Sequence, residues 1–462
     1  MKRTVRNSLI ISAVSAIMIL SGCGGGKTTD KKVTISVGNW PSDENSYTYK
    51  AHQEWLEAMK NDYPDIEIIP DHYQYGIDTF FVRGASGQLP TIYLTWFTEV
   101  NKIVEAGYCA DITDQMNENG YDKALNPLFK DLIQKDGKYY AVPYDAYAQG
   151  LAVNKKLFRE AGLINENGTA KLPGTYEELI QMAKIIKDKT GKAGFVFPTS
   201  DNYGGWHFMN IAWSYGVEFM KQNEDGTWKA TFDSPECVAA MQYVKDLKWK
   251  YDVLPSEMQV SGSELKKQFA EGRAAMCFLP LTQNEMFTRY GMKKEDMAYA
   301  RVPAGPEGRF AQMGGNIYMI SNQASEEEKN AAFKWFETIG VTPKVSDRQI
   351  KAWKSSADSA VSKGGIEIGE DPIKLWADPE RNEKHKEAVA EFVNVSHDDF
   401  DDYLSFDRVN IKPEEPTECQ QLYSVLDTAI QEVLSDKNSN VAAVVKKAND
   451  NFQTNFLDKV EK

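Results

Sequence analysis

The chain has 462 residues, and 53 Lys and Arg stand against 67 Asp and Glu, which gives a formal net charge of −14. This length exceeds what one hydrophobic core usually covers, so two lobes are expected. The acidic balance argues against nucleic acid as a partner, because neutralising phosphates requires a basic face. The five cysteines form no Cys-x-x-Cys pair, so we expect no metal site, no redox chemistry and no cofactor.

Residues 1–22 have the layout of a secretory signal peptide. Basic residues precede an apolar run at 9–20, which is too short to span a bilayer at 1.5 Å per residue. Residues 21–28, "SGCGGGKT", lack only the first glycine of a phosphate-binding P-loop. A strand pattern follows them where a P-loop needs a helix, so the phosphate-loop interpretation fails.

Residues 20–23, "LSGC", resemble a bacterial lipobox, in which small residues precede a cysteine that becomes lipidated. On that resemblance Cys23 is the lipid anchor, and residues 23–32 form a flexible tether. We therefore expect an extracytoplasmic protein at the outer face of the cell membrane, since the two or three acyl chains of a lipoprotein bind a membrane firmly. A secreted protein with an unmodified Cys23 is the alternative.

After the tether, strand patterns alternate with helix patterns. Strand-like segments occupy 33–37, 63–70, 90–96, 138–145 and 150–158. Helices are expected from Tyr47, from the capping boxes at 175–178 and 325–328, from Ser234-Pro235, and over 263–272 and 417–434. This alternation predicts an α/β fold with mainly parallel sheets.

The order of four regions gives the chain a family resemblance. They are "GQLPTIYLTWFTEVNKIVEAGYCADIT" (87–113), "GKYYAVPYDAYAQGLAVNKKLFREAGL" (137–163), "PGTYEELIQMAKIIKD" (173–188), and "FAEGRAAMCFLP" (269–280) together with 303–336. With these, the chain resembles the extracellular solute-binding proteins of sugar-type ABC importers, the group that contains maltose-binding protein. Thr91 replaces the Asp that this family prefers, Asn154 follows Val instead of Tyr, and residues 341–416 have no clear counterpart.

The resemblance implies a two-lobe periplasmic-binding-protein-like fold, with discontinuous lobes joined by hinge strands. We expect 33–143 and 300–340 in the first lobe, and 146–298 and 341–455 in the second. It also implies a monomer that captures a sugar or oligosaccharide between the lobes and delivers it to the membrane permease subunits of an ABC transporter. Hinge closure around the ligand is the expected conformational change.

Candidate ligand-binding residues follow from a rule that is independent of the family: sites in open α/β sheets lie beyond the carboxyl ends of strands. Loops at such positions combine aromatic rings, which suit the apolar face of a pyranose, with carboxylates and amides, which suit its hydroxyls. The candidates are Trp40, Asp43, Glu44, Trp96, Glu99, Tyr144, Asp145, Tyr147, Trp206, Asn210, Trp213, Asn284, Gly314, Gly315 and Asn316.

Some of these residues have a second interpretation. Trp40 and Trp96 end strands beside polar residues, so we favour the pocket, whereas Trp213 fits pocket or core equally. Asp145 fits either a ligand contact or a brace of the hinge.

Two other functions fit parts of the pattern. Aromatic and acidic loops also suit a polyamine through cation–π contact, or a peptide. A glycan-cleaving enzyme would use paired carboxylates in the same cleft, but no nucleophile or metalloenzyme motif accompanies them. We therefore expect a binding protein without catalytic residues.

Overall fold

The computed structural model describes residues 32–44, 46–281, 284–370, 373–405 and 409–460. The predicted signal peptide, the lipid anchor Cys23 and all but the last residue of the predicted tether lie outside these ranges. Within them, no helix combines the length and the apolar character that a membrane span requires. Cys109, Cys237, Cys277 and Cys419 are buried free thiols.

One mixed sheet runs through the molecule, in the order β10-β6-β11-β3-β1-β2, with β12 beside β11 and β9 beside β6. Its strands are β1 (Val33–Val37), β2 (Ile66–Pro70), β3 (Ile92–Trp96), β6 (Ala141–Asn154), β9 (Met276–Pro280), β10 (Met297–Ala300), β11 (Phe310–Ile320) and β12 (Asn410–Lys412). Only the pairings β1–β2, β1–β3 and β11–β12 are parallel, so the prediction of mainly parallel sheets is wrong. The reason is that the two longest strands, β6 and β11, pair antiparallel with each other.

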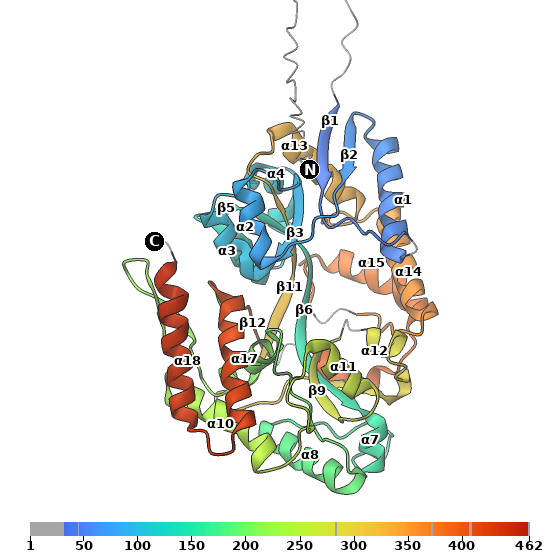
Figure 1. The fold of residues 1–462 in the computed structure, drawn as a ribbon. Helices are drawn as coiled ribbons and strands as arrows, with labels where there is room; N and C mark the ends of the chain where they lie inside the picture. Colours follow the sequence, from blue (N-terminus) through green and yellow to red (C-terminus); the bar gives the residue numbers. More distant parts are fainter. Residues whose placement is uncertain (1–31, 45, 282–283, 371–372, 406–408, 461–462) are drawn as a thin grey trace, which may run out of the picture.

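Strands β6 and β11 join two lobes (Figure 1). Residues 141–148 of β6 pair with β11, whereas residues 149–153 pair with β9 in the second lobe. In the same way, β11 begins beside β12 and ends beside β3 of the first lobe. The segments 138–145 and 150–158, predicted as separate strands, contribute residues 141–145 and 150–154 to the one strand β6, because residues 146–149 between them also pair across the sheet. Residues 155–158, predicted as extended, are helical instead.

Helices of the first lobe pack on β1, β2 and β3. They are α1 (Tyr47–Asp62), α2 (Ile77–Ala85), α3 (Val100–Glu105), α4 (Thr113–Glu118), α5 (Tyr121–Ala124), α6 (Pro127–Ile133) and α13 (Glu326–Thr338). The predicted capping box of α13 is present: Ser325 accepts from the Glu328 backbone, and the Glu328 carboxylate accepts from the Ser325 backbone. This cap starts the helix whose buried Trp335 and Phe336 close the core over β1.

The second lobe is mainly helical around β9, β10 and the lower half of β6. Its principal helices are α7 (Lys155–Glu160), α8 (Tyr176–Thr190), α9 (Tyr203–Ser214), α10 (Pro235–Trp249), α11 (Gly262–Ala270), α17 (Cys419–Ser435) and α18 (Val441–Asn455). Helix α9 was not predicted, because two glycines near its start lower its helix propensity. Those glycines allow α9 to lie against α17, where an added Cβ on Gly205 would come within 2.4 Å of the Tyr423 carbonyl oxygen.

The segment without a family counterpart contacts both lobes. It contains α14 (Asp347–Ser362) and α15 (Pro379–Val389), seen at the right of Figure 1 between the lobes. Two hydrogen bonds join the segment to the first lobe. The hydroxyl of Tyr121 donates to the Val341 carbonyl, and the backbone N–H of Asn126 donates to the Leu375 carbonyl. The Ile366 backbone N–H donates instead to Asn284 of the second lobe. The boundary that assigned all of 341–455 to the second lobe does not agree with these contacts.

The packing of α9 on α17 gives a stability prediction. Gly205→Ala should lower the free energy of unfolding by about 1–3 kcal/mol, because the methyl group would overlap the Tyr423 backbone. The better helix propensity of alanine offsets about 1 kcal/mol at most. Thermal unfolding of the full chain by circular dichroism measures this.

Gly76→Ala is the matched control, since Gly76 has an extended backbone and only the flexible Thr79 side chain lies near its added methyl. Equal stability of both variants would contradict the close packing of α9 on α17.

Candidate functional site

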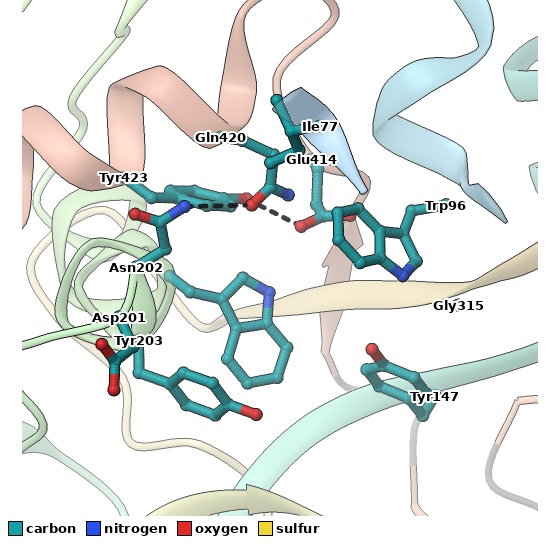
Figure 2. A pocket seen from close by; sticks show the side chains of 11 residues that line it. Ile77, Trp96, Tyr147, Asp201, Asn202, Tyr203, Gly315, Glu414, Gln420 and Tyr423 are labelled. Atoms are coloured by element: carbon teal, nitrogen blue, oxygen red, sulfur yellow. Dashed lines mark hydrogen bonds between the residues drawn. The ribbon is translucent and has the colours of Figure 1, made fainter. Parts of the chain in front are cut away.

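A cavity of about 310 Å³ lies between the lobes, where the paired strands β6 and β11 pass from one lobe to the other (Figure 2). Its volume is at the lower end of the range of about 300–1,000 Å³ typical of small-molecule sites. Its walls are Ile77, Trp96, Tyr147, Asp201, Asn202, Tyr203, Trp206, Gly315, Glu414, Gln420 and Tyr423. Residues of both lobes and of both crossing strands therefore meet at one site.

Trp96 forms the first-lobe wall at the end of β3. The ring of Tyr75 supports it edge-on, with 5.2 Å between ring centroids. The Tyr75 hydroxyl donates to the Glu99 carboxylate at 2.5 Å, and Thr98 donates to the other carboxylate oxygen at 3.1 Å. Glu99 is only 4% exposed, and this burial raises the pKa of its carboxyl. Glu99 therefore lies behind the wall and holds Tyr75, and through it Trp96.

The crossing strands supply the floor. A Cβ on Gly315 would come within 2.3 Å of the Asp145 carbonyl oxygen, and one on Gly314 within 2.8 Å of the Tyr147 ring. Glycine at both positions therefore lets β6 and Tyr147 approach β11 closely. Tyr147 and the Gly315 backbone both face the cavity.

The start of α9 forms the second-lobe wall. Asp201 and Asn202 have left-handed backbones, with φ of 60° and 67°. The buried Asp427 of α17 holds this turn, since its carboxylate accepts from the backbone N–H of Asn202 at 2.8 Å and of Gly205 at 2.7 Å. Burial raises the pKa of Asp427 to about 6. The turn brings Tyr203 and Trp206, in the first turn of α9, to the cavity.

Glu414 projects into the cavity from the loop after β12 (Figure 2). The Tyr423 hydroxyl donates to its carboxylate at 2.9 Å, and Gln312 donates to that hydroxyl in turn at 2.5 Å. Burial, and secondarily the negative charge of Glu99, raise the pKa of Glu414 to about 8. The carboxyl is therefore mostly protonated at neutral pH in the empty site.

The electrostatic character of the cavity is acidic. Asp201 and Glu414 contribute carboxyl groups, and no Lys or Arg is among the described residues that line it. No group of three or more His, Cys, Asp or Glu in the described chain is placed to hold a metal ion. The walls instead offer five aromatic rings, with hydroxyl, amide and carboxyl groups between them. Such walls suit a small polar ligand with an apolar face.

Some predicted site residues line this cavity, namely Trp96, Trp206 and Gly315, with Tyr147 of the crossover. Gly314 and Glu99 support the lining from behind.

The prediction that Trp40 lines the ligand pocket is wrong. Trp40 is 2% exposed and stacks on Trp335, with 5.8 Å between ring centroids, while His52 meets it edge-on. Asn39 before it has a left-handed backbone and turns the chain, and the backbone N–H of Trp40 donates to the backbone carbonyl of Asp71. The ring therefore enters the core of the first lobe. Asp43 and Glu44, a few residues on, are exposed and outside the cavity walls.

Three polar or aromatic candidates of the second lobe have structural roles instead. Trp213 is 2% exposed, and its indole N–H donates to the Glu415 carboxylate. Asn210 is fully buried and accepts from the Gln312 backbone N–H. Asn284 accepts from Ile366 and so fixes the segment that bridges the lobes. None of the three lines the cavity.

Asp145, Asn316 and Tyr144 lie at the hinge. The Asp145 carboxylate accepts from both the backbone N–H and the side-chain amide of Asn316, at 2.9 Å each. Burial raises the pKa of Asp145. Tyr144 and Asp145 line a second cavity, next to α14 and α15 and separate from the first. Of the two interpretations of Asp145, the brace of the hinge fits these contacts.

Several lining residues were missed. Asp201, Asn202 and Tyr203 lie in the stretch that suggested Trp206, and the turn-forming pair Asp-Asn before glycines was the available signal. Tyr423 has the spacing of a core residue of α17. Glu414 lies in the segment without a family counterpart, so nothing in the sequence marked it.

The chain is similar in sequence to known binding proteins. The family model described as bacterial extracellular solute-binding protein matches residues 39–340. The maltotriose-binding protein of Pyrococcus abyssi is 23% identical over 288 residues, which cover 61% of this chain and 57% of that protein. The arabinooligosaccharide-binding protein of Halalkalibacterium halodurans is 26% identical over 215 residues, 45% of each chain. The alignments thus span about half the length of these relatives.

Solved structures share the fold. The structure of T. maritima MalE3 with bound maltose matches with a TM-score of 0.65 and 21% identity, over 91% of this chain and 99% of that one. UgpB from Mycobacterium tuberculosis, in complex with glycerophosphocholine, matches with a TM-score of 0.67 and 14% identity, over 93% and 98%. The predicted two-lobe periplasmic-binding-protein fold is confirmed.

The family match extends from just after β1 to just after α13, well over half of the chain, and it includes the floor of the cavity and most of its walls. Its members are binding proteins and not enzymes. This chain belongs to the bacterial extracellular solute-binding protein family.

Proposed function

We propose that this protein captures a sugar or oligosaccharide between its two lobes and delivers it to the permease subunits of an ABC transporter. The observation that carries the proposal is the convergence of five aromatic rings and several hydrogen-bonding groups, from both lobes, on one cavity at the hinge strands. Both curated relatives named above are oligosaccharide-binding by name, which agrees with this chemistry.

The two indole rings come from opposite lobes. Trp96 belongs to the first lobe and Trp206 to the second, with Tyr147 beside Trp206 at 6.3 Å between ring centroids. A pyranose has apolar C–H faces that pack on such rings, while its hydroxyls fit the acids and amides around them. A ligand that contacts both walls stabilises the closed arrangement of the lobes, and a permease recognises that arrangement.

A non-sugar solute, such as a polyamine or a peptide, is the second candidate. The acidic lining without a lysine or arginine favours it, since an ammonium group would also interact with the ring faces.

We also propose that Cys23 is lipidated and holds the protein at the outer face of the cell membrane. The proposal rests on the basic start, the short apolar run and the small residues before this cysteine.

Ligand class is tested by thermal unfolding of the full chain with panels of oligosaccharides, polyamines and peptides. A ligand at 100 times its dissociation constant should add about 2.7 kcal/mol to the free energy of unfolding. We expect stabilisation by oligosaccharides without turnover. Stabilisation by polyamines or peptides alone would contradict the sugar proposal.

Trp96→Ala and Trp206→Ala should each weaken saccharide binding by roughly 10- to 150-fold, since each loses about 1.5–3 kcal/mol of apolar burial against the ligand. Isothermal titration calorimetry measures the dissociation constants. Trp40→Ala is the matched control: it should lower the free energy of unfolding by about 3–5 kcal/mol and leave affinity unchanged in the folded protein. Weaker binding by the Trp40 variant alone would contradict the assignment of the cavity.

Lipidation is tested by growing cells with a labelled fatty acid. The wild-type protein should carry the label and sediment with membranes, whereas Cys23→Ala should do neither. Retained label in the variant, or an unlabelled wild type, would contradict the anchor.

A further inference from the structure

The carboxyl of Glu414 has no cationic partner among the residues that the structure describes. It lies at the cavity between the side chains of Tyr423 and Trp206, both of which are neutral donors. The basic residues nearby are engaged elsewhere: Lys102 pairs with Glu418 at 2.9 Å, and the Lys412 ammonium lies 4.6 Å from the Trp213 ring centroid. Removing this carboxylate from water therefore carries a cost that no charge on the described residues offsets.

Among the groups that face Glu414 from neighbouring elements, the Glu99 carboxylate adds to this cost, whereas the hydrogen bonds from Tyr423 and Trp206 reduce it. Tyr423 and Cys419 lie on α17, Trp206 on α9, Tyr147 on β6, and Glu99 in the 3-10 turn after β3 (Phe97–Glu99). Of these, only Glu99 has a carboxyl group, and its negative charge disfavours a second negative charge on Glu414. The potential at this end of the cavity therefore favours a positive charge.

Aromatic side chains surround the same point. Trp96, Tyr147, Trp206 and Tyr423 all line the cavity with Glu414. Aromatic ring faces attract ammonium groups, by about 0.5–2 kcal/mol each depending on desolvation. A hydroxyl group of a neutral sugar would satisfy the hydrogen bonds of Glu414 but would not supply the missing charge.

We propose that the Glu414 end of the cleft binds an ammonium group on the ligand, so that the substrates are amino sugars or oligosaccharides that contain an unacetylated amino sugar. This inference rests on the proposed saccharide function and narrows it to one class. The ammonium group donates to the Glu414 carboxylate and lies among the rings, while the remaining hydroxyls contact the acids and amides of the walls.

The proposal predicts a proton release. Because the pKa of Glu414 is about 8 in the empty site, the carboxyl is protonated at pH 6.5, and an ammonium ligand must displace that proton to gain the ion pair. Affinity for an amino sugar should therefore rise as the pH increases from 6 to 7. Acetylation removes the ligand's charge, so an N-acetylated sugar should bind without releasing a proton.

The test is titration calorimetry of the full chain with glucosamine dimers and trimers, their N-acetylated counterparts and cellobiose, at pH 6.5 in buffers of different ionisation enthalpy. We expect the amines to bind at least tenfold more tightly than the acetylated sugars and to release close to one proton. Glu414→Gln should weaken amine binding at least tenfold, abolish the proton release, and change binding of the acetylated sugars by less than threefold.

One control variant locates the effect. Glu44→Gln, outside the cavity, should behave as the wild type. Proton release that persists in Glu414→Gln, or that is lost in Glu44→Gln, would overturn the assignment to Glu414.

Folding of Glu414→Gln is checked by its pH profile. A carboxyl whose pKa is raised on folding makes the protein less stable as the pH rises from about 4.5 to about 8, because the folded state holds the proton more tightly. In Glu414→Gln this part of the decrease in stability with rising pH should be absent, while the melting temperature at pH 5 stays near that of the wild type.

The outcomes separate this inference from the proposed function. Neutral saccharides that bind as tightly as the amines would overturn the inference and leave the saccharide function intact. If no saccharide binds, both the inference and the saccharide function are overturned. Binding of spermidine in that case would not rescue either of them.

Discussion

The antiparallel pairing of β6 with β11 is the constraint on which the rest of the structure depends. It carries the backbone from the first lobe to the second twice, and it places the cavity on one side of the crossing and the segment with α14 and α15 on the other. The register shifts between Asn316 and Ile317, because Tyr144 is an extra residue on β6. Asp145 closes this bulge by accepting from Asn316 twice, so a buried carboxylate replaces the regular ladder where the lobes meet.

The composition of the cavity follows from this crossing. Gly314 and Gly315 lack side chains because β6 and Tyr147 approach β11 too closely to admit one, and their backbone becomes the floor. The walls are then set by elements that each lobe fixes independently: Trp96 through Tyr75 in the first lobe, and the start of α9 through Asp427 in the second. A ligand at this point would contact Trp96 of the first lobe and the start of α9 of the second, which would couple its binding to the relative position of the lobes.

The fold was predictable because its evidence is local, whereas the site was predictable only in part. The alternation of segments and the caps at Thr175 and Ser325 mark helices and strands within a few residues of where they occur. Trp40 and Trp96 show the limit, since Trp40 lies just after β1 and Trp96 at the end of β3, both beside polar residues. Trp40 turns into the core because Trp335, almost 300 positions later, supplies its partner, and a local pattern does not contain that contact. Glu414 was missed for the same reason, since only the packing of α17 against α9 brings its loop to the cavity.

Two adjacent carboxyl groups show how the protein treats charge at this site. Glu415 accepts from the Trp213 indole and lies 4.0 Å from the Lys412 ammonium, and these two contacts offset part of the burial that raises the pKa of its carboxyl. Glu414 faces the cavity, the donors to it among the described residues are neutral, and burial raises its pKa to about 8. The same loop thus places one carboxyl near a lysine and its neighbour at the cavity, without a cation among the described residues. The proposed ammonium group would supply the positive charge that the described residues do not give Glu414, and a ligand without that charge would leave the carboxyl protonated.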